Sequence, residues 1–365
     1  MRFLVRLQVL LSILFFSCYP IKSLAQENNY YFFHPVTYGS ESTFNPISLI
    51  ANGGFDELQS TWRSSSLSEI PWKDGSENVW YNIIAPFPQI NKFGWNDFIF
   101  HEVIPRSFKA DDAQYFPNYT LHLIGGGMQY RKATEWFDYY GYPLPFVCAL
   151  ITTMGYHYIN ETLENGKWVG PNTDPIADLL IFDPLGIVLF SFDGVCKFFS
   201  SEVSLNDWNN QPAFSFFPLG LQNTGQNFIM KYPITASGRT SLMYHFGTFG
   251  ELGLSMKTNK EDAVSFGIGM SSNSIQTSLN SRGAPIFTVT LGPRAGIYWD
   301  RNNSLMASVV ASDNFNGRLT FNIYPGVFSI KSFSPGFFLI ADASGAYTIG
   351  MTASILPLGI STNRP

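Results

Sequence analysis

The sequence predicts a mainly β protein with a helical insert, and in more detail an outer-membrane antiparallel β-barrel of about 8–12 strands with roughly three helices packed in or against it. Apolar residues alternate with small polar residues through the C-terminal part, and an export signal begins the chain. Only 13% of the residues are charged, while 16% are aromatic. A soluble protein needs charge on its surface, so this composition is typical of a surface that faces lipid.

The segment 1–25 has the parts of a signal peptide. Arg2 and Arg6 precede an apolar run, and a small-x-small cleavage site ends at Ala25. A lipoprotein signal with Cys18 acylated is the alternative, but the usual small residue before the cysteine is missing. We therefore expect export by a cleaved signal peptide and localisation in the cell outer membrane of a Gram-negative cell.

The charge balance excludes one class of partner. The chain has 27 acidic and 22 basic residues, and removal of the signal peptide makes it more acidic. The sequence has no basic cluster that would bind a phosphate backbone, so we expect no nucleic-acid partner. The expected partners are the lipid bilayer and a lipid or envelope protein.

Residues 26–117 are rich in aromatic residues, Asn and Pro. Prolines interrupt the stretch 84–88, which favours extended segments, turns and one short helix. We expect this region to contribute some strands to the barrel. The segment 93–104 fits either an interfacial strand or an amphipathic helix.

Residues 118–202 form the expected helical insert, because apolar positions recur there at helical spacing. The predicted helices are Met128 to Tyr140, Phe146 to Leu163 and Pro175 to Phe199. Asp174 and Pro175 suit the first turn of the last helix, and Asp183-Pro184 should break or kink it. Residues 139–160 carry no formal charge, but prolines and polar residues interrupt them, so we expect helices buried in protein or lying at a membrane surface.

Residues 203–365 supply the barrel strands. Because the side-chain period of a strand is two, each strand presents one set of residues to each face. The clearest apolar sets are Val264, Phe266, Ile268 and Met270, and Tyr347, Ile349, Met351 and Ala353; the alternating sets are Ser265, Gly267, Gly269 and Ser271, and Thr348, Gly350, Thr352 and Ser354. A soluble β-sandwich is the alternative, but its outer face would carry charged residues.

The small residues of the second face predict a filled interior. A water-filled porin lumen would hold charged and large polar side chains, whereas Gly, Ser and Thr dominate here. Something must pack close against them, most simply the helices of residues 118–202. A free-standing pore is the less favoured interpretation.

Two cysteines remain after signal cleavage, Cys148 and Cys196. An exported protein allows one disulfide between the two helical segments that carry them. Two separately buried thiols are the simpler alternative.

The common catalytic and cofactor motifs are missing from the sequence, among them the G-x-S-x-G elbow, H-E-x-x-H, C-x-x-C, the P-loop and the dinucleotide glycine pattern. We therefore expect no cofactor. Gly125-Gly126-Gly127 lacks the spacing of a phosphate loop and predicts a tight turn or close packing.

Polar residues inside the apolar helices form the candidate site. His157 and Glu161 are four residues apart and share a helix face, as do Asp174 and Asp178. His122, His157 and Glu161 would offer two imidazoles and a carboxylate to a divalent metal, which would activate water against a lipid ester. His157, Glu161 and Asp178 are the candidate catalytic acid–base residues.

A hydroxyl nucleophile would complete a site without metal, and the candidates are Ser191 and Thr153. The structural alternative gives the polar residues local roles. His157 would pair with Glu161, and Asp178 would bond to nearby backbone or to Arg131.

Trp136, Tyr140 and Tyr156 are the candidate lipid- or ligand-binding residues. They belong to an aromatic cluster before and within the second predicted helix. Such rings fit a membrane interface, where one edge is wet and the other apolar. Core packing explains the cluster about equally well.

Two stretches of the third helical segment stand out: Asn172-Thr173-Asp174-Pro175-Ile176-Ala177-Asp178-Leu179 and Asp183-Pro184-Leu185-Gly186. They resemble a segment of an uncharacterised family of Gram-negative envelope proteins, in which a helical block is followed by barrel-like strands. The resemblance implies residence in the cell envelope and a shared helical unit that contains Asp174 and Asp178. It implies no activity.

Our first functional hypothesis is a non-enzymatic outer-membrane protein with a role in lipid handling, assembly or scaffolding. The alternative is a membrane-embedded hydrolase or acyltransferase that acts on lipid through the His/carboxylate site. A transport channel is the second alternative.

Overall fold

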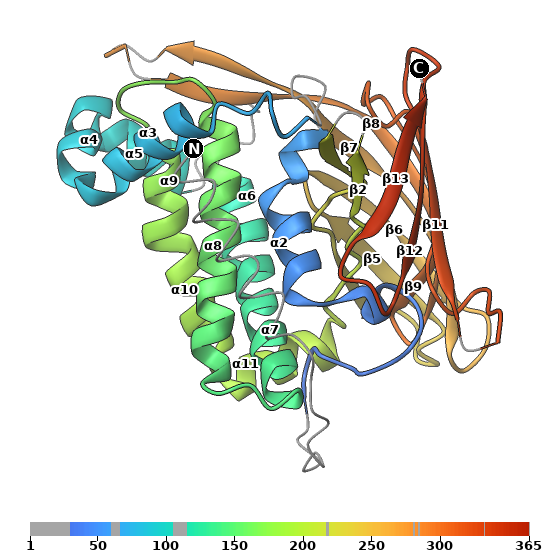
Figure 1. The fold of residues 1–365 in the computed structure, drawn as a ribbon. Coiled ribbons are helices and arrows are strands. Elements are labelled where there is room, and N and C mark those ends of the chain that lie inside the picture. The colour runs from blue at the N-terminus through green and yellow to red at the C-terminus, as the bar shows by residue number, and fades with distance from the viewer. Residues whose placement is uncertain are drawn as a thin grey trace.

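The computed structural model describes residues 30–59, 66–104, 115–216, 219–279, 282–283, 285–331 and 333–364, so the expected signal peptide lies outside the described residues. A layer of helices stands beside one large curled sheet (Figure 1). The prediction of a β-rich protein with packed helices is confirmed at this level.

The described part of region 26–117 forms helices where strands were expected. It forms α2 (Pro46–Gly54), α3 (Trp72–Ile84), α4 (Pro86–Phe93), α5 (Trp95–Phe98) and the π-helical segment η3 (Ile99–Val103). Pro46 and Pro86 explain the error, because they occupy first helical turns, where a backbone N–H has no intrahelical partner to lose. In the described part of this region, strand pairing is limited to an isolated bridge at Ser66.

Residues 118–202 are mainly helical, as expected. They form η5 (Asn118–Gly126, π-helical), α7 (Gly127–Tyr139), α8 (Pro145–Asn165), α9 (Asp174–Ala177), η6 (Asp178–Phe182, π-helical), α10 (Asp183–Phe190), α11 (Asp193–Lys197) and η7 (Phe198–Glu202, π-helical), and the short α6 (Tyr115–Pro117) comes directly before them. The predicted break at Asp183-Pro184 does not form, because the chain stays helical from Asp174 to Phe190 and Pro184 lies in the first turn of α10, directly after the π-helical η6.

The sharp bend of this segment comes later. The axis turns by 84° between Asp174–Phe190 and Asp193–Glu202. Among the described helices, no single one is long and apolar enough to cross a membrane, and this bent pair meets the length and hydropathy requirement only when its two parts are taken together.

The described strands form a single sheet of 13 strands, in the order β1-β4-β5-β6-β7-β8-β9-β10-β11-β12-β13-β2-β3. They are β1 (Asn206–Asp207), β2 (Ala213–Phe216), β3 (Leu219–Gln222), β4 (Phe228–Pro233), β5 (Thr240–Phe246), β6 (Phe249–Lys257), β7 (Asp262–Leu279), β8 (Pro285–Arg301), β9 (Ser304–Ser312), β10 (Leu319–Ile323), β11 (Pro335–Ala341), β12 (Tyr347–Ala353) and β13 (Gly359–Arg364). The order has two ends, and β13 pairs with β2 in parallel. The expected closed antiparallel barrel of about 8–12 strands is therefore corrected to an open sheet with one parallel pair.

A bent hairpin explains the two ends of the sheet. One arm contains β1 and β2, and the other contains β3 and β4; β1 pairs with β4, and β2 pairs with β3. The end strand β1 continues along the chain into β2, which also pairs with β13, and the end strand β3 continues into β4, which also pairs with β5. At the bend, the Trp208 backbone N–H donates to the carbonyl of Asn227 (2.8 Å), and the Asn210 backbone N–H donates to that of Gly225 (3.1 Å). The two ends of the sheet are thus held near each other without a continuous ladder.

Burial confirms the predicted alternation on β7 and from Tyr347 to Met351 of β12, but not at the end of β12, where Ala353 is buried and Ser354 is exposed. The apolar set on β7 is exposed by between 36% and 59%, and Tyr347, Ile349 and Met351 of β12 are exposed as well. Ser265 and Ser271, which alternate with the β7 set, are buried. The sheet therefore has an apolar outer face.

Side chains of the strands and their connections fill the inner face. Trp208, Met243, Tyr298 and Tyr324 are buried in one cluster there. The small residues make room for such rings: a Cβ on Gly350 would lie 2.1 Å from Phe338 Cζ. The inference of a filled interior is thus supported, but by the strands' own side chains.

The helices pack against the outer face of the sheet at β4 and β5. Phe228 and Phe246 join Met128 and Phe190 in a buried cluster there. Of the two expected placements, in or against the sheet, the helices take the second, and the expectation that they pack against the small residues of the inner face is wrong. The small residues of the inner face make room for aromatic rings of neighbouring strands, not for helices.

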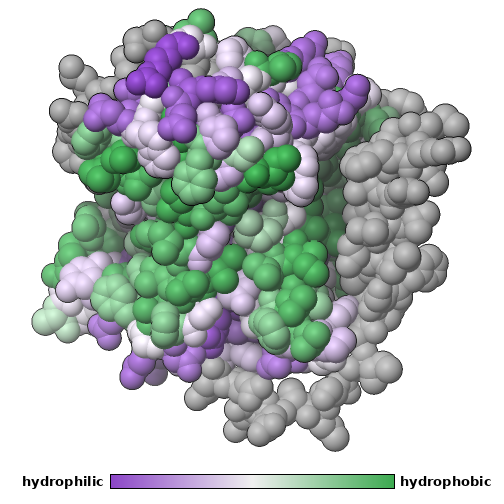
Figure 2. Space-filling view, turned by 90° about the vertical axis from the view of Figure 1, so that its left-hand side faces the viewer, coloured by the Kyte–Doolittle hydropathy of each residue, from purple (hydrophilic) through white to green (hydrophobic). Residues whose placement is uncertain are grey.

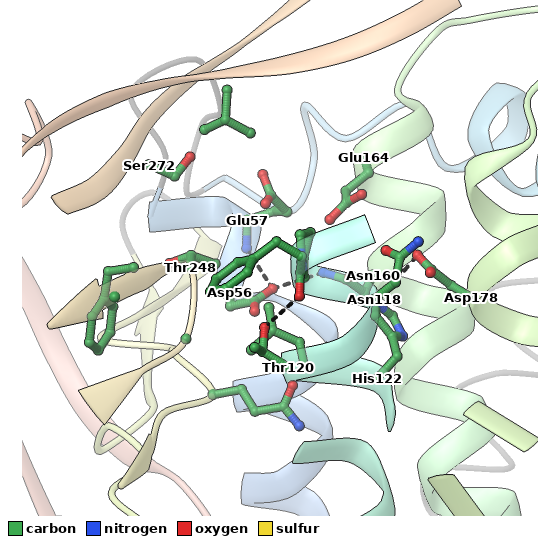
Figure 3. A pocket seen from close by; sticks show the side chains of 18 of the residues that line it. Asp56, Glu57, Asn118, Thr120, His122, Asn160, Glu164, Asp178, Thr248 and Ser272 are labelled. Carbon is green, nitrogen blue, oxygen red and sulfur yellow. Dashed lines mark hydrogen bonds and ion pairs between the residues drawn. The ribbon is translucent and has the colours of Figure 1, made fainter. Parts of the chain in front are cut away.

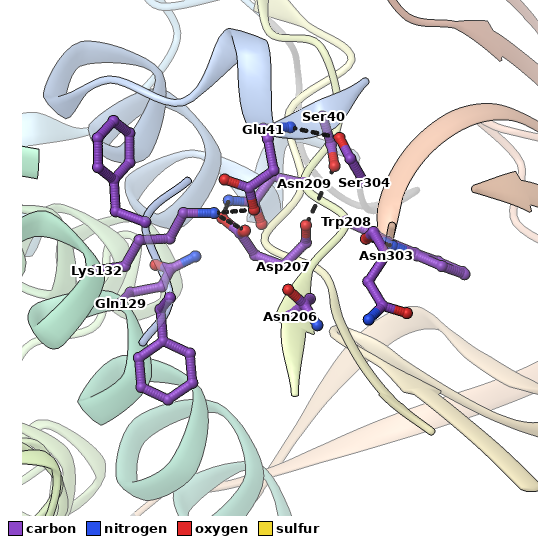
Figure 4. Close-up of polar contacts among 12 residues, drawn as sticks. Ser40, Glu41, Gln129, Lys132, Asn206, Asp207, Trp208, Asn209, Asn303 and Ser304 are labelled. Carbon is purple, nitrogen blue, oxygen red and sulfur yellow. Dashed lines mark hydrogen bonds and ion pairs between the residues drawn. The ribbon is translucent and has the colours of Figure 1, made fainter. Parts of the chain in front are cut away.

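A buried ion cluster ties α7 to the sheet (Figure 4). Lys132 Nζ donates a hydrogen bond to Glu41 Oε1 at 2.5 Å and another to Asp207 Oδ1. Glu41 lies on the 3-10 helix η1 (Ser40–Thr43) and Asp207 on β1. All three side chains are almost fully buried, so the helices and the sheet form one packed unit.

The helical layer also exposes an apolar band. Figure 2 shows this face, with hydrophobic side chains across its middle and hydrophilic ones above and below. Exposed apolar residues of these helices include Leu150 and Ile151 of α8 and Leu185 and Val188 of α10. Cys148 and Cys196 are free thiols on α8 and α11, so the alternative without a disulfide is confirmed for these two residues.

Candidate functional site

A cavity of about 480 Å³ lies between the helical layer and strands β6, β7 and β8 (Figure 3). Its helical wall is polar and includes His122, Asn160 and Asp178. Its strand wall is largely apolar and includes Met270 and Leu291. A cavity with one polar and one apolar wall suits an amphiphilic molecule.

Helical segments from distant parts of the sequence form the polar wall. η5 carries His122, α8 carries His157, and α9 with η6 carries Asp174 and Asp178, and all four line the cavity. Glu161 shares the face of α8 that carries His157 and lies beside His122 and Asp178, next to the lining residues. All five side chains are buried or nearly so. The shared helix faces predicted from the four-residue spacings are consistent with this arrangement.

Glycines allow these segments to approach one another closely. A Cβ on Gly126 would lie 2.9 Å from His157 Nε2, and a Cβ on Gly127 would lie 2.6 Å from the carbonyl oxygen of Gly186. Of the two alternatives for the triple glycine, close packing is the one that forms.

His122 lies between two carboxylates. Its Nε2 is 3.3 Å from Asp178 Oδ2, and its Nδ1 is 2.9 Å from Asp183 Oδ1. His157 Nε2 is 3.2 Å from the same Asp183 oxygen, and the two imidazole centroids are 4.7 Å apart. A carboxylate on one ring nitrogen fixes the orientation of an imidazole and leaves its other nitrogen for a ligand.

The cluster is rich in buried negative groups. Burial raises the pKa of Asp178 to about 8, and burial with the nearby Asp178 and Asp174 raises that of Glu161 well above its ordinary value. Burial alone would lower the pKa of His122, but the Asp178 and Asp183 carboxylates raise it to about 9. Without further cations, the cluster therefore retains protons at neutral pH.

Some buried acceptor atoms of the cluster lack a hydrogen-bond partner among the described residues. They are Glu161 Oε1, Asp178 Oδ1 and Asp183 Oδ2. An unsatisfied buried polar atom costs about 1–3 kcal/mol, so native proteins rarely keep several together. A bound cation would satisfy these oxygens.

Groups of side chains in the cluster hold their ligand atoms within 4.8 Å of one another: His122 with His157 and Asp183, His122 with Glu161 and Asp178, and Glu161 with Glu164 and Asp174. Imidazole and carboxylate donors suit divalent ions such as Zn²⁺, Mn²⁺ and Fe²⁺. The donor chemistry and the unsatisfied oxygens both fit a metal site.

The predicted metal ligands lie in this cluster but in different groups. His122 and Glu161 belong together with Asp178, whereas His157 shares Asp183 with His122. The expected local pair of His157 with Glu161 gives way to the contact between His157 and Asp183. The three predicted acid–base residues are all part of the cluster.

Asp178 does not bond to Arg131 as the structural alternative expected. Arg131 pairs with Glu135 and Asp193, each at 2.9 Å. Thr153 is buried and Ser191 donates to the carbonyl of Ile187, and neither is among the described residues that line the cavity. The geometry therefore gives little support to a hydroxyl nucleophile.

The predicted ligand-binding aromatics pack in a core beside the cavity. Trp136 and Tyr156 are buried with Phe33, and Tyr140 packs against the same cluster half-buried. Gln226 Nε2, from the cavity wall, donates to the Tyr156 hydroxyl at 3.0 Å. A ligand-binding role for these residues stays a prediction, and core packing accounts for their positions.

Sequence reasoning missed Asp183, Glu164 and Asp56 as site residues. Asp183 was interpreted as a helix break because proline follows it. Glu164 lies three residues after Glu161 on α8, a spacing that keeps both on one helix face. Asp56 lines the cavity and accepts a hydrogen bond from Asn160 Nδ2 at 2.8 Å. An acidic residue inside an apolar stretch was the usable signal for Asp183.

No family model, curated protein or solved structure matches this chain significantly.

Proposed function

We propose that this protein is an outer-membrane hydrolase that cleaves an ester bond of an amphiphilic, lipid-like substrate at a divalent-metal centre. One observation carries the proposal: the polar wall of the cavity includes His122 and Asp178, which belong to a buried His/carboxylate cluster with unsatisfied oxygens, and the opposite wall is largely apolar. Of the hypotheses from the sequence, the geometry favours the enzyme over the non-enzymatic role.

His122, Glu161 and Asp178 are the proposed ligands. A divalent cation there would lower the pKa of a bound water and supply a hydroxide nucleophile at neutral pH. With Nε2 on the cation, His122 Nδ1–H would donate to Asp183 Oδ1, and this hydrogen bond would hold Nε2 toward the ligand position.

Asp56 is the proposed proton donor to the leaving group. It lines the same cavity, and burial raises its pKa well above the ordinary value for an aspartate, so the carboxyl keeps its proton. Asn160 fixes its orientation through the hydrogen bond to Oδ1.

The strand wall would receive the apolar part of the substrate. Met270, Val289 and Leu291 line it, together with Phe116 from the helical side. An apolar tail here would bury surface at about 25 cal/mol per Å². The substrate class is therefore an amphiphile whose polar ester lies near His122.

The outer face of the sheet supports the proposed place in the outer membrane. Strands β5 to β13 expose large apolar side chains over a wide surface, including Leu252, Phe266, Ile297 and Ile349. Exposed apolar surface of this extent is typical of a membrane or protein contact. We propose the lipid bilayer as that partner.

A non-enzymatic lipid-handling protein is the second candidate. The apolar strand wall favours this second candidate, because a lipid carrier would also need an apolar wall to bind the acyl chain. A carrier would not need carboxylate oxygens that can bind a metal. A channel is not proposed, since Trp208 and Tyr298 occupy the inner face of the sheet.

Metal analysis and lipid turnover test the proposal. The full-length protein, purified in detergent, should retain or take up a divalent ion and release fatty acid from ester lipids in mixed micelles. His122→Gln and Glu161→Gln should lose both, whereas Asp193→Asn, at an exposed carboxylate of the same helical layer, should lose neither. Lipid turnover that survives both cluster variants would refute the metal-dependent mechanism.

A further inference from the structure

We propose that the His/carboxylate cluster at the polar wall of the cavity holds two divalent cations, bridged by Glu161, rather than one. This inference rests on the metal centre of the proposed function and extends it. The first cation would bind His122, Asp178 and Glu161, and the second would bind Glu161, Glu164 and Asp174.

The two ligand groups share one residue. In each group the ligand atoms of the three side chains lie within 4.8 Å of one another, and Glu161 belongs to both. A carboxylate has two oxygens and can therefore contact two cations. Glu161 Oε1 has no hydrogen-bond partner among the described residues, although the side chain is 1% exposed.

The helices supply these ligands in register. Glu161 and Glu164 are three residues apart on α8, and Asp174 and Asp178 are four residues apart across α9 and η6. Each helix thus presents two carboxylates on one face. Facing helices that present carboxylates in this way can build a two-metal centre in a helical bundle.

Charge balance favours two cations over one. The proposed ligands include the four carboxylates Glu161, Glu164, Asp174 and Asp178, and His122 adds no charge once its Nε2 is bound to a cation. The buried Asp183 beside His122 makes the surroundings more negative still. Two divalent cations neutralise four carboxylates, whereas one would leave two buried negative charges to be removed by protons. Unpaired buried charge is strongly unfavourable.

The second site has a distinct metal preference. Its ligands are carboxylates, which suit Mg²⁺ and Mn²⁺, whereas the first site adds an imidazole, which is the donor that Zn²⁺, Fe²⁺ and Ni²⁺ also accept. Mn²⁺ is compatible with both donor sets and is paramagnetic. It is therefore the probe we choose.

Mn²⁺ stoichiometry and electron paramagnetic resonance test the inference on the full chain in detergent. Equilibrium dialysis should give two Mn²⁺ per chain, with the spectrum of an exchange-coupled pair. Asp174→Asn and Glu164→Gln should each reduce the count to one and give an uncoupled spectrum. Asp193→Asn is the control and should keep the coupled pair.

The outcomes separate this inference from the proposed function. A single uncoupled Mn²⁺ per wild-type chain would overturn the second site and leave the first. Absence of bound Mn²⁺ in a wild-type chain that also takes up no Zn²⁺ would overturn both. The wild-type count needs no variant, so a variant that fails to fold does not affect the test.

Discussion

Asp183 connects the two histidines of the cluster without lining the cavity itself. One oxygen of this carboxylate lies 2.9 Å from His122 Nδ1 and 3.2 Å from His157 Nε2. Asp183 is therefore a positioning residue: it orients the two imidazoles, and His122 is the residue that would contact the metal. The buried carboxylate is 2% exposed, so solvent screening of these contacts is weak.

Asp183→Asn should weaken the first equivalent of Mn²⁺ by about 10- to 100-fold, the usual cost of losing a partner that orients a metal-binding histidine. The amide keeps the shape of the side chain but loses the charge. The measurement is Mn²⁺ titration by equilibrium dialysis, with Asp193→Asn as the matched control. An unchanged affinity would show that His122 is oriented by other contacts.

Glu41 gives the fold a pH dependence that is independent of the metal site. Burial raises its pKa from 4.5 to about 7, Lys132 opposes this shift, and Asp207 adds to it. Because the folded-state pKa is higher than the unfolded one, the folded protein binds this proton more tightly. The stabilisation from Glu41 is fully present below about pH 4.5 and is lost as the pH rises to about 7.

Glu41→Gln should therefore flatten the fall in the free energy of unfolding between pH 4.5 and 7. The measurement is urea unfolding in detergent across this range, on the wild type and the variant. Glu202→Gln, at an exposed carboxylate on η7, is the control and should keep the wild-type slope. Equal slopes for wild type and Glu41→Gln would contradict the assignment.

The sequence identified part of the site for a clear physical reason. His122, His157, Glu161 and Asp178 are polar residues within apolar helical stretches, and burying such groups is costly unless they have partners. Their pairing could not be predicted, because Asp183 reaches both histidines only through the packing of η5, α8 and α10.

At the scale of the elements, close backbone contact between η5, α7 and α10 holds the cluster together. A Cβ on Gly186 would lie 2.6 Å from the carbonyl oxygen of Leu123 and 3.2 Å from the Gly127 backbone nitrogen. Both neighbours are backbone atoms, so they cannot yield by a change of rotamer. The helix that carries Asp183 would have to move away from the helix that carries His122.

Gly186→Ala should destabilise the fold by about 1–3 kcal/mol through overpacking and should also weaken Mn²⁺ binding. Gly155→Ala is the matched control, because a Cβ there meets nothing within 4 Å; it should be stabilising by about 0.5–1 kcal/mol, since alanine is the better helix former. Thermal unfolding of both variants measures these changes in stability. Equal stability of the two variants would mean that the helices can separate freely.

Proline explains which elements could be predicted. The helices α7 and α8 follow clear apolar periods, and the predicted ranges agree closely with the observed ones. In residues 26–117, the prolines of stretch 84–88 indicated extended segments and turns, but Pro86 starts α4, and Pro46 likewise starts α2. A proline disfavours helix at the positions before it but is well tolerated in the first turn of a helix. Where the apolar period is weak, a proline alone therefore cannot tell a helix start from an extended segment.

At the scale of the whole molecule, the period of the strands and the closure of the sheet are separate questions. Alternation on β7 and β12 was predictable because side-chain direction follows from the backbone alone. Closure of the sheet depends on how the segment 206–233 pairs. A bend in this segment divides its hairpin into two paired parts, one of β1 and β4 and the other of β2 and β3. Nothing in the local pattern specifies such a bend, nor that β13 pairs with β2 in parallel.

The apolar outer face leads to a prediction for the proposed membrane contact. Ile268 lies in the middle of the exposed apolar set of β7 and is 59% exposed. If this face meets acyl chains, Ile268→Arg places a charge in hydrocarbon and should destabilise the membrane-bound protein by about 2–4 kcal/mol. In water the same change would be nearly neutral, because an exposed arginine is well solvated there.

Ile355→Arg is the matched control, since Ile355 is 79% exposed but lies outside the strands, between β12 and β13. Unfolding of both variants from liposomes should give a large loss for Ile268→Arg and a small one for Ile355→Arg. The contrast depends on where each residue lies relative to hydrocarbon, because both replace an exposed isoleucine by arginine. If the two variants are equally stable in liposomes, this face of the sheet meets water or protein, and the cavity beside it must receive its substrate by another route.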